Sequence, residues 1–493
     1  MTEPQSQLRI GLGLWAALLG VAGCATVPRP EPAESGWVEV HTRHLNIRAQ
    51  LDEGAAIEVA RSMEAVRSGL TAFFQTDLDE DRLDAVLFRD HASLSDFAPF
   101  AVRGFLVETH SGPWLVTSLT AFRDSSFQIV EAHELAHHLS AYVMLRQPRW
   151  LSEGLASWLE TLELDRAHHR VVFGKPPSWI RPEDLATRPV TTAALWQWQG
   201  PEIPPQEAYG HVAQSWWLVH HLLEKRPAQF ADFRRLLKTG ADPRAAWNQA
   251  FIGLTDAALD AELLSSLPHL TDQRSALPLK LEPVEPTVSP LPAAEVHAIQ
   301  AVLQAHSSEP LERSRAIQKI EQQLNAALGL DPQNERALLL TAWLVIDDRQ
   351  RIAFLRRVVG QLPYSGKALG ALALNLALKG EDPRAMLQHA HALEPTDPNI
   401  LDRLAWYSAV YGEPTRAVAL AEEAVSRRPW SPDFVSTLAL ALGAAGRCPE
   451  AAERQAQALD LLGHSTLDRR ALESQLALYA QGCSPEQPIR PRR

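Results

Sequence analysis

The pattern of apolar and polar positions changes twice along the chain. Residues 37–270 mix short alternating segments, typical of strands, with longer segments of helical spacing. Residues 271–292 are rich in proline and lose the helical periodicity. From residue 293 onward the spacing is helical throughout. We therefore expect a domain of strands and helices over 37–270, a proline-rich linker over 271–292 and an all-α domain over 293–482.

Alternation with a period of two predicts strands in the first domain, and apolar residues three or four apart predict helices. The predicted strands are Trp37–Arg43, Leu45–Leu51, Leu83–Phe88, Gly104–Glu108 and Trp114–Leu119. The main predicted helices are Ala55–Phe74, Ser126–Leu145, Leu151–Leu164 and Tyr209–Leu223. The segment 168–205 is rich in proline and tryptophan and predicts loops over a cleft. Half of the fourteen tryptophans lie between Trp150 and Trp217, and we expect them to fill a core rather than line a substrate wall.

A repeated layout divides the all-α domain. A Leu-Ala pair and a glycine eight residues after its leucine recur at Leu372 and Gly380, Leu404 and Gly412, and Leu438 and Gly446. Small residues let two antiparallel helices approach closely, and the glycine turns the chain between them. The layout resembles the tetratricopeptide repeat, with the signature tryptophan and tyrosine largely missing. The predicted parts are a helical pair at Ala293–Leu328, a fourth repeat at Asn334–Gln361, a capping helix at Leu467–Ala480 and a tail over 483–493. The resemblance implies binding of a protein partner.

The overall charge argues against one class of partner. The chain has 493 residues, a formal net charge of -12 and a pI near 5.8, and it shows no basic stripe that could replace the counterions of a nucleic acid. Its apolar content of 46% is that of ordinary globular protein.

The N-terminal residues look like an export signal. The run Ile10–Ala22 is apolar, follows Arg9 and is too short to span a bilayer as a stable helix. Val21-Ala22-Gly23-Cys24 resembles the lipobox of bacterial lipoproteins, which implies a signal peptide over 1–23, lipidation of Cys24 and a tether over 24–36. Ala25 after the cysteine implies the outer membrane, facing the periplasm. A plain signal peptide cut nearby is the alternative.

The remaining cysteines lie near the end of the all-α domain. Cys448 opens the second helix of the last repeat, and Cys483 follows the capping helix. Antiparallel packing makes these two ends neighbours, so an oxidising periplasm favours a disulfide between them over two free thiols.

The residues with the most chemical meaning are His133-Glu134-Leu135-Ala136-His137. Two histidines four residues apart lie on one face of a helix, about 6 Å apart along its axis, and can share one metal ion. In this pattern the imidazoles bind one zinc ion and Glu134 takes a proton from water. Glu153, in the segment Trp150-Leu151-Ser152-Glu153-Gly154, is the best candidate for a third ligand, ahead of His168 and His169.

These segments resemble the gluzincin branch of the zinc metallopeptidases, and among them the peptidase MA-like proteins. The resemblance covers roughly Trp37–Leu267 and implies an α+β zincin-like domain in which His133, His137 and Glu153 bind zinc and Glu134 is the general base. A metzincin would need a glycine and a third histidine where Ser140 and Val143 stand. Ser157 replaces the aspartate that thermolysin-like enzymes place four residues beyond the third ligand, so another group must orient the histidines.

Two further roles follow less directly. Gluzincins often place a tyrosine or histidine on a later helix to stabilise the developing negative charge, which makes Tyr209 or His211 candidates, although both could merely cap or pack their helix. The predicted strand Trp114–Leu119 is the candidate for pairing with an extended peptide. The expected function is peptide-bond hydrolysis at the bacterial envelope. The alternative is a lipid-anchored interaction scaffold with a structural or inactive zincin domain.

Overall fold

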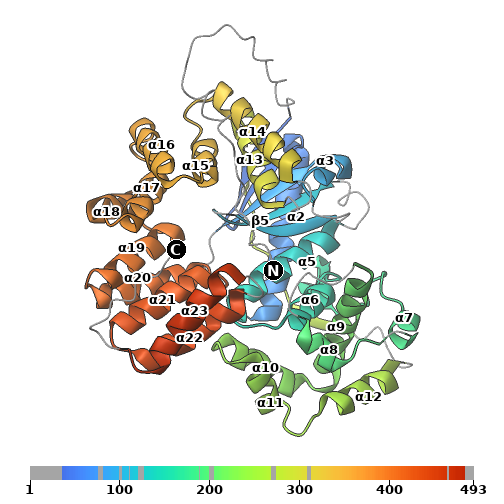
Figure 1. Ribbon diagram of the computed structural model, residues 1–493. Helices are drawn as coiled ribbons and strands as arrows, with labels where there is room; N and C mark the ends of the chain where they lie inside the picture. The colour runs from blue at the N-terminus through green and yellow to red at the C-terminus, as the bar shows by residue number, and fades with distance from the viewer. Residues whose placement is uncertain are drawn as a thin grey trace.

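A six-stranded mixed sheet organises the N-terminal half of the chain (Figure 1). In this computed structural model the described residues are 36–75, 82–98, 103–109, 111–119, 127–187, 189–198, 205–267, 274–307, 313–462 and 466–483. The strands lie in the order β4-β5-β3-β2-β1-β9. Their bounds are Val38–His41 for β1, Leu45–Ala49 for β2, Leu83–Phe88 for β3, Gly104–Thr109 for β4, Gly112–Ser118 for β5 and Thr287–Pro290 for β9. β2, β3 and β5 are parallel, and the other neighbours are antiparallel.

Alternation along the central strands gives the sheet two apolar faces. In β3, Ala85 and Leu87 join the core formed with α2 (Glu53–Phe74) and α5 (Phe127–Val143). Val86 and Phe88 point the other way and pack with α13 (Ala293–Ser307) and α14 (Arg313–Leu330). The first helix pair of the all-α domain therefore covers one face of the sheet, because that face would otherwise stay exposed.

The proline-rich segment 271–292 contains strands, so the prediction of a linker there was wrong. β9 pairs with β1, and β8 (Ser275–Pro278) pairs with β7 (Arg170–Phe173). β7 also pairs with β6 (Glu163–Asp165), which gives a second, three-stranded sheet. The chain thus leaves the first domain only after adding a strand to each of its sheets.

Helices after α5 form a lobe beside the sheet (Figure 1). Most of the clustered tryptophans are buried there, including Trp150, Trp158, Trp216 and Trp217, so the core interpretation is confirmed for them. The segment expected to be loops also holds β7 and two short helices. The helices of the lobe are α6 (Arg149–Leu159), α7 (Pro182–Thr187), α8 (Thr192–Gln197), α9 (Pro205–Lys225), α10 (Pro227–Lys238), α11 (Pro243–Ala250) and α12 (Asp256–Ser266).

The C-terminal half is a tetratricopeptide-like series of helix pairs, as the sequence predicts. Its turns contain Gly380, Gly412 and Gly446, each with a φ between 76° and 92°, a backbone conformation that glycine adopts without steric cost. The pairs after α14 are α15 (Glu335–Leu344) with α16 (Asp348–Gln361), α17 (Gly366–Leu378) with α18 (Arg384–Leu393), α19 (Pro398–Val410) with α20 (Pro414–Arg427), and α21 (Pro432–Ala444) with α22 (Cys448–Leu462), followed by α23 (Thr466–Ala480).

The end of this solenoid returns to the first domain. Arg428 and Trp430, in the turn between α20 and α21, contact the end of β4, its turn into β5, and α5. Arg146, just after α5, forms an ion pair with Asp460 of α22. Cys448 and Cys483 form a disulfide near the C-terminal end of the solenoid, with their Cα atoms 5.7 Å apart. The solenoid therefore contacts the first domain at both of its ends.

Three predicted features of the N-terminus lie outside the described residues, namely the signal peptide over 1–23, the lipidation site Cys24 and, except for Gly36, the tether over 24–36. Within the part of the chain that the structure describes, no helix is both long enough and apolar enough to cross a membrane.

Candidate metal site

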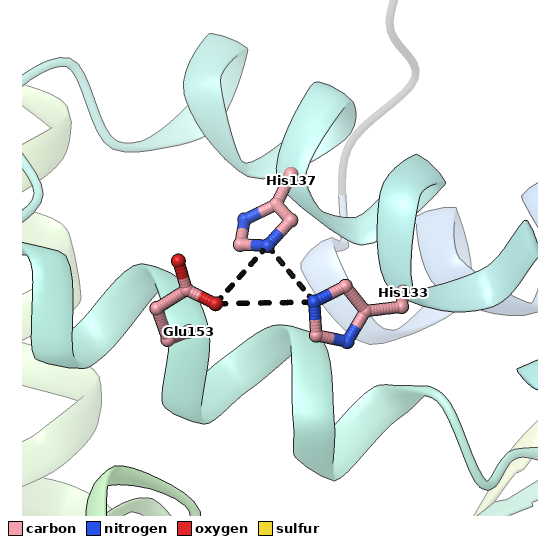
Figure 2. Close-up of side chains that lie close together, drawn as sticks. All are labelled: His133, His137 and Glu153. Atoms are coloured by element: carbon pink, nitrogen blue, oxygen red, sulfur yellow. Dashed lines mark hydrogen bonds and ion pairs between the residues drawn. The ribbon is translucent and has the colours of Figure 1, made fainter. Parts of the chain in front are cut away.

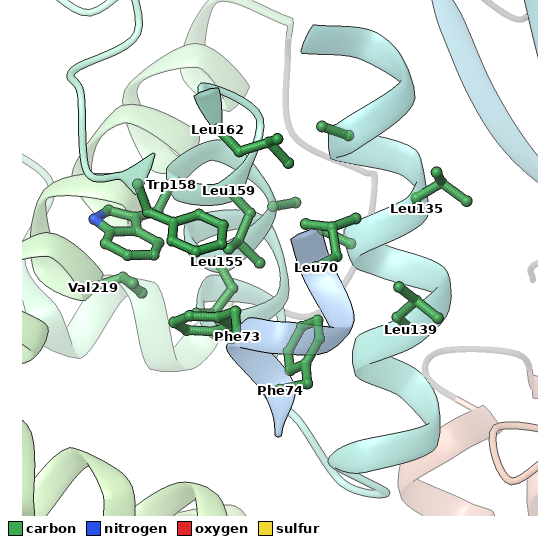
Figure 3. Close-up of a cluster of buried hydrophobic side chains, with 14 of the residues drawn as sticks. Leu70, Phe73, Phe74, Leu135, Leu139, Leu155, Trp158, Leu159, Leu162 and Val219 are labelled. Atoms are coloured by element: carbon green, nitrogen blue, oxygen red, sulfur yellow. The ribbon is translucent and has the colours of Figure 1, made fainter. Parts of the chain in front are cut away.

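The histidine helix α5 is fixed by its apolar side. Leu135 and Leu139 face Leu70 and Phe74 of α2, as Figure 3 shows, and both leucines are fully buried. The two histidines lie on another side of the helix, about a fifth exposed. Burial of the leucines therefore sets the rotation of α5 and points both imidazoles toward α6.

Helix α6 supplies the third side chain. Gly154 packs against α9 so closely that a Cβ atom there would lie 2.5 Å from the carbonyl oxygen of Ser215. Only glycine permits this approach, and it places the neighbouring Glu153 opposite the histidines. Oε2 of Glu153 lies 3.6 Å from Nε2 of His137 and 3.9 Å from Nε2 of His133 (Figure 2).

The three side chains fit a metal ion. Nε2 of His133 lies 3.1 Å from Nε2 of His137, so two nitrogens that carry lone pairs in the neutral rings face one another beside a carboxylate. Ligands bound to zinc at 2.0–2.1 Å in tetrahedral geometry would be roughly 3.3 Å apart, close to the three separations here. Among the described residues this trio is the single group of three or more such side chains that could hold a metal.

The outer nitrogens of the histidines are also held. Nδ1 of His133 donates a 2.8 Å hydrogen bond to Oε2 of Glu160, which is 4% exposed. Nδ1 of His137 lies 2.9 Å from Oγ of Ser152. Nε1 of Trp179 donates a 2.7 Å hydrogen bond to the other oxygen of Glu160. Because each Nδ1 is occupied by these contacts, each Nε2 stays available for a metal ion between the two rings and Glu153. Metal-binding histidines are commonly held in this way. Sequence reasoning noticed the missing aspartate at Ser157 but did not find Glu160 or Ser152.

The surrounding charges favour a cation at this point. Burial lowers the pKa of His133, but the hydrogen bond and charge of Glu160 and the charges of Glu134 and Glu153 raise it to about 9. Burial raises the pKa of Glu153, but His137, His133 and Arg149 lower it to about 2. A proton or a metal ion between the imidazoles would therefore be stabilised by nearby carboxylates.

Glu134 lies on the same helix, beside the two histidines. Its side chain is half-buried and forms no hydrogen bond or ion pair with the described residues. Its carboxylate thus keeps its oxygen atoms available to accept a proton.

Tyr209 and His211 lie outside the trio, and each connects to it through a tryptophan. The hydroxyl of Tyr209 donates a 2.8 Å hydrogen bond to the carbonyl oxygen of Trp179. The ring of His211 lies 5.1 Å from that of Trp198, which stacks on Arg149. Their predicted role in stabilising negative charge stays a prediction.

His168 is exposed and pairs with Asp165, and it does not belong to the metal-binding group. His169, also exposed, adopts a left-handed backbone with φ of 51°.

The prediction that the strand Trp114–Leu119 pairs with an extended peptide was wrong. β5 is paired on both sides, with β3 and with β4. β4 is one of the two edge strands, β9 being the other, and among the described strands β5 is the single neighbour of β4. Gly104 of β4 lies against Val130, one helical turn before Glu134, so the start of this strand contacts α5.

Comparisons with known proteins bear on the solenoid alone. No family model matches the chain, and no curated protein matches it. The crystal structure of MamA protein is 19% identical, covers 34% of this chain and 91% of its own, and gives a TM-score of 0.25. A thermophilic TPR protein of Thermus thermophilus is 20% identical, covers 38% of this chain and 99% of its own, and gives a TM-score of 0.28. TM-scores this low carry no structural argument. Because no family model or curated protein matches the chain, the resemblance to metallopeptidases rests on its residues alone.

Proposed function

We propose that this protein is a zinc-dependent peptidase held at the bacterial cell envelope by a lipid on Cys24, with a helical-repeat domain that binds a protein partner. The observation that carries the peptidase proposal is the convergence of His133, His137 and Glu153, whose facing atoms lie 3.1 to 3.9 Å apart. The envelope location rests on the N-terminal sequence pattern.

His133, His137 and Glu153 would hold one zinc ion, and the open position of such an ion lowers the pKa of water and polarises a carbonyl group. Glu134 accepts the proton of the attacking water at its carboxylate and donates it to the leaving nitrogen. Glu160 and Ser152 keep the two imidazoles in the orientation that this chemistry needs.

The edge strand β4 offers a place for an extended peptide. Its outer N–H and C=O groups can pair with a substrate backbone, and its start lies against α5 close to Glu134. In this mode of binding, hydrogen bonds to the peptide backbone provide affinity, and the residues around the strand determine which substrate side chains are accepted.

The solenoid favours a second candidate function, that of a protein-binding scaffold. A cavity of about 830 Å³ lies between the inner helices and the sheet, and its lining includes Arg48, Arg336, Asn375 and Trp406. In this alternative the chain is a protein-binding scaffold, and the trio holds a structural metal or none.

The test compares the wild-type protein with Glu134→Gln, using Glu183→Gln, an exposed position on α7, as the control. Each is purified, analysed for zinc and given a broad peptide library. We expect Glu134→Gln to keep its zinc and to lose hydrolysis by about 100- to 10,000-fold. Retained hydrolysis would refute the proposed role of Glu134. Stoichiometric zinc without cleavage of any peptide by the wild-type protein would favour the scaffold.

A further inference from the structure

Arg149 brings a positive charge next to the ligand trio. It is the first residue of α6, and its Nη2 lies 3.6 Å from Oε1 of Glu153, one helical turn later. Its guanidinium carbon lies 4.7 Å from the ring centre of Trp198, which is buried. The side chain is 32% exposed. Arg149 is thus held in place by a ring and an ion pair and remains accessible from solvent.

The donors of Arg149 are unused within the described part of the chain. A guanidinium offers five N–H groups, yet Arg149 makes no hydrogen bond there, and its Nε is buried without a partner. The 3.6 Å separation from Glu153 is an ion pair but too long for a hydrogen bond. Arg244 differs, because it stacks on Trp196 at the same distance of 4.7 Å but also donates a 2.7 Å hydrogen bond to Asp256.

The position of Arg149 relative to Glu153 indicates which part of a substrate it could reach. Oε2 is the oxygen of Glu153 that pairs with the two histidines (Figure 2), whereas Arg149 pairs with the other oxygen, Oε1. The guanidinium therefore lies next to the oxygen of Glu153 that does not take part in the convergence of ligand atoms. A group bound by Arg149 would be a neighbour of the carbonyl under attack, not that carbonyl itself.

We propose that Arg149 binds a carboxylate of the peptide substrate close to the scissile bond, so that the site selects substrates with an anionic group there. The planar fork of an arginine matches a carboxylate with two parallel hydrogen bonds, which would occupy the unused donors. The carboxylate could be the free C-terminus of the substrate or the side chain of an aspartate or glutamate. This inference rests on the proposed peptidase function.

The test measures binding without turnover, in the Glu134→Gln background, by isothermal titration calorimetry. The probes are N-acetyl-Ala-Ala, its C-terminal amide, and N-acetyl-Ala-Asp amide. We expect at least one of the two carboxylate probes to bind about 10- to 100-fold more tightly than the neutral amide, and the tighter one identifies the source. Adding Arg149→Gln should remove this preference, and adding Arg244→Gln should not.

Two results would overturn the inference. One is equal binding of all three probes to the Glu134→Gln protein. The other is a preference for carboxylates that survives Arg149→Gln, because the anion would then be recognised by the metal or by another group. If Arg149→Gln does not fold, Arg149→Lys takes its place. It keeps the charge without the fork and should lose most of the preference, so full retention would contradict the proposal.

Kinetics separate this inference from the proposed function. If the wild-type protein cleaves no peptide, the proposed function fails, but the binding comparison still tests Arg149. If cleavage occurs, Arg149→Gln should raise KM for the carboxylate substrates and leave KM for amides unchanged. An equal loss of kcat for both kinds of substrate would mean that Arg149 acts on the reacting carbonyl, which would refute the inference and leave the function standing.

Discussion

Glu160 accepts a 2.8 Å hydrogen bond from Nδ1 of His133, and this contact connects the end of α6 with the middle of α5. Glu160 lies seven residues after Glu153, so α6 and its C-cap supply both a proposed ligand and the support for another proposed ligand. Trp179 holds the second oxygen of Glu160 from outside. The site is therefore built by the crossing of two helices.

Replacing Glu160 should weaken zinc binding. Glu160→Gln keeps the shape of the side chain but removes the charge that fixes the orientation of His133, and we expect an affinity for zinc lower by about 10- to 100-fold. Competition with a chelator of known zinc affinity measures this change. Glu163→Gln, three residues later and about half exposed, serves as the control. Equal zinc affinity in the Glu160→Gln and wild-type proteins would show that Glu160 does not support His133.

The sequence predicted the parts of the site that follow from helical spacing. His133, Glu134 and His137 are fixed by one helix, and Glu153 was identified by its resemblance to a known pattern. Glu160 was missed because its contact depends on the angle at which α6 crosses α5, which no local spacing encodes. Tyr209 was placed on the correct helix, but its hydroxyl bonds to the carbonyl oxygen of Trp179.

The contact between the solenoid and α5 depends on Trp430. Its ring lies 4.8 Å from that of Tyr142 and 5.6 Å from that of His138, and its Nε1 donates a hydrogen bond of 3.2 Å to Glu108. We expect Trp430→Ala to cost about 2 kcal/mol, because it removes two ring contacts and a hydrogen bond.

Amide hydrogen exchange measures whether Trp430→Ala loosens the helices on the two sides of this contact, α5 and α21. In Trp430→Ala, amides of α5 and α21 should exchange faster than in the wild-type protein, whereas Trp343→Ala, at a position 51% exposed on α15, should leave α5 unchanged. Unchanged protection of α5 in Trp430→Ala would mean that this contact does not hold the solenoid to the first domain.

Long-range contacts of this kind cannot be predicted from sequence periodicity, which indicates local secondary structure only. Trp430 and Tyr142 lie far apart in the sequence, and the pattern of residues around each gives no sign that the two rings are in contact. The strands β8 and β9 were missed for a related reason, since each has four residues, includes proline and gains its hydrogen bonds from strands far away in sequence. The glycines of the solenoid turns were predicted correctly, because their role depends on local backbone conformation alone.

Acid should destabilise the first domain through Glu64. Burial raises its pKa, but hydrogen bonds from His44 and Thr42 lower it below the ordinary value of 4.5. A pKa that is lower in the folded state stabilises the fold above about pH 4.5, and this contribution is lost as the pH falls through the folded value.

Thermal unfolding at pH 6 and at pH 3.5 tests this effect. Glu64→Gln should lower stability by about 1–3 kcal/mol at pH 6 and should lose less on acidification than the wild-type protein does. Glu58→Gln, an exposed position on the same helix, should follow the wild-type profile. Identical pH profiles of the wild-type and Glu64→Gln proteins would show that the Glu64 carboxylate does not carry the effect.

The zinc content of purified protein shows whether His133, His137 and Glu153 bind a metal ion. Inductively coupled plasma mass spectrometry is applied to the wild-type protein and to Glu153→Ala, after dialysis against a weak chelator. We expect close to one zinc ion per wild-type chain and a loss of most of it in Glu153→Ala, with folding checked by circular dichroism. Absence of zinc from the wild-type protein, or equal zinc in both proteins, would contradict the assignment of His133, His137 and Glu153 as a metal site.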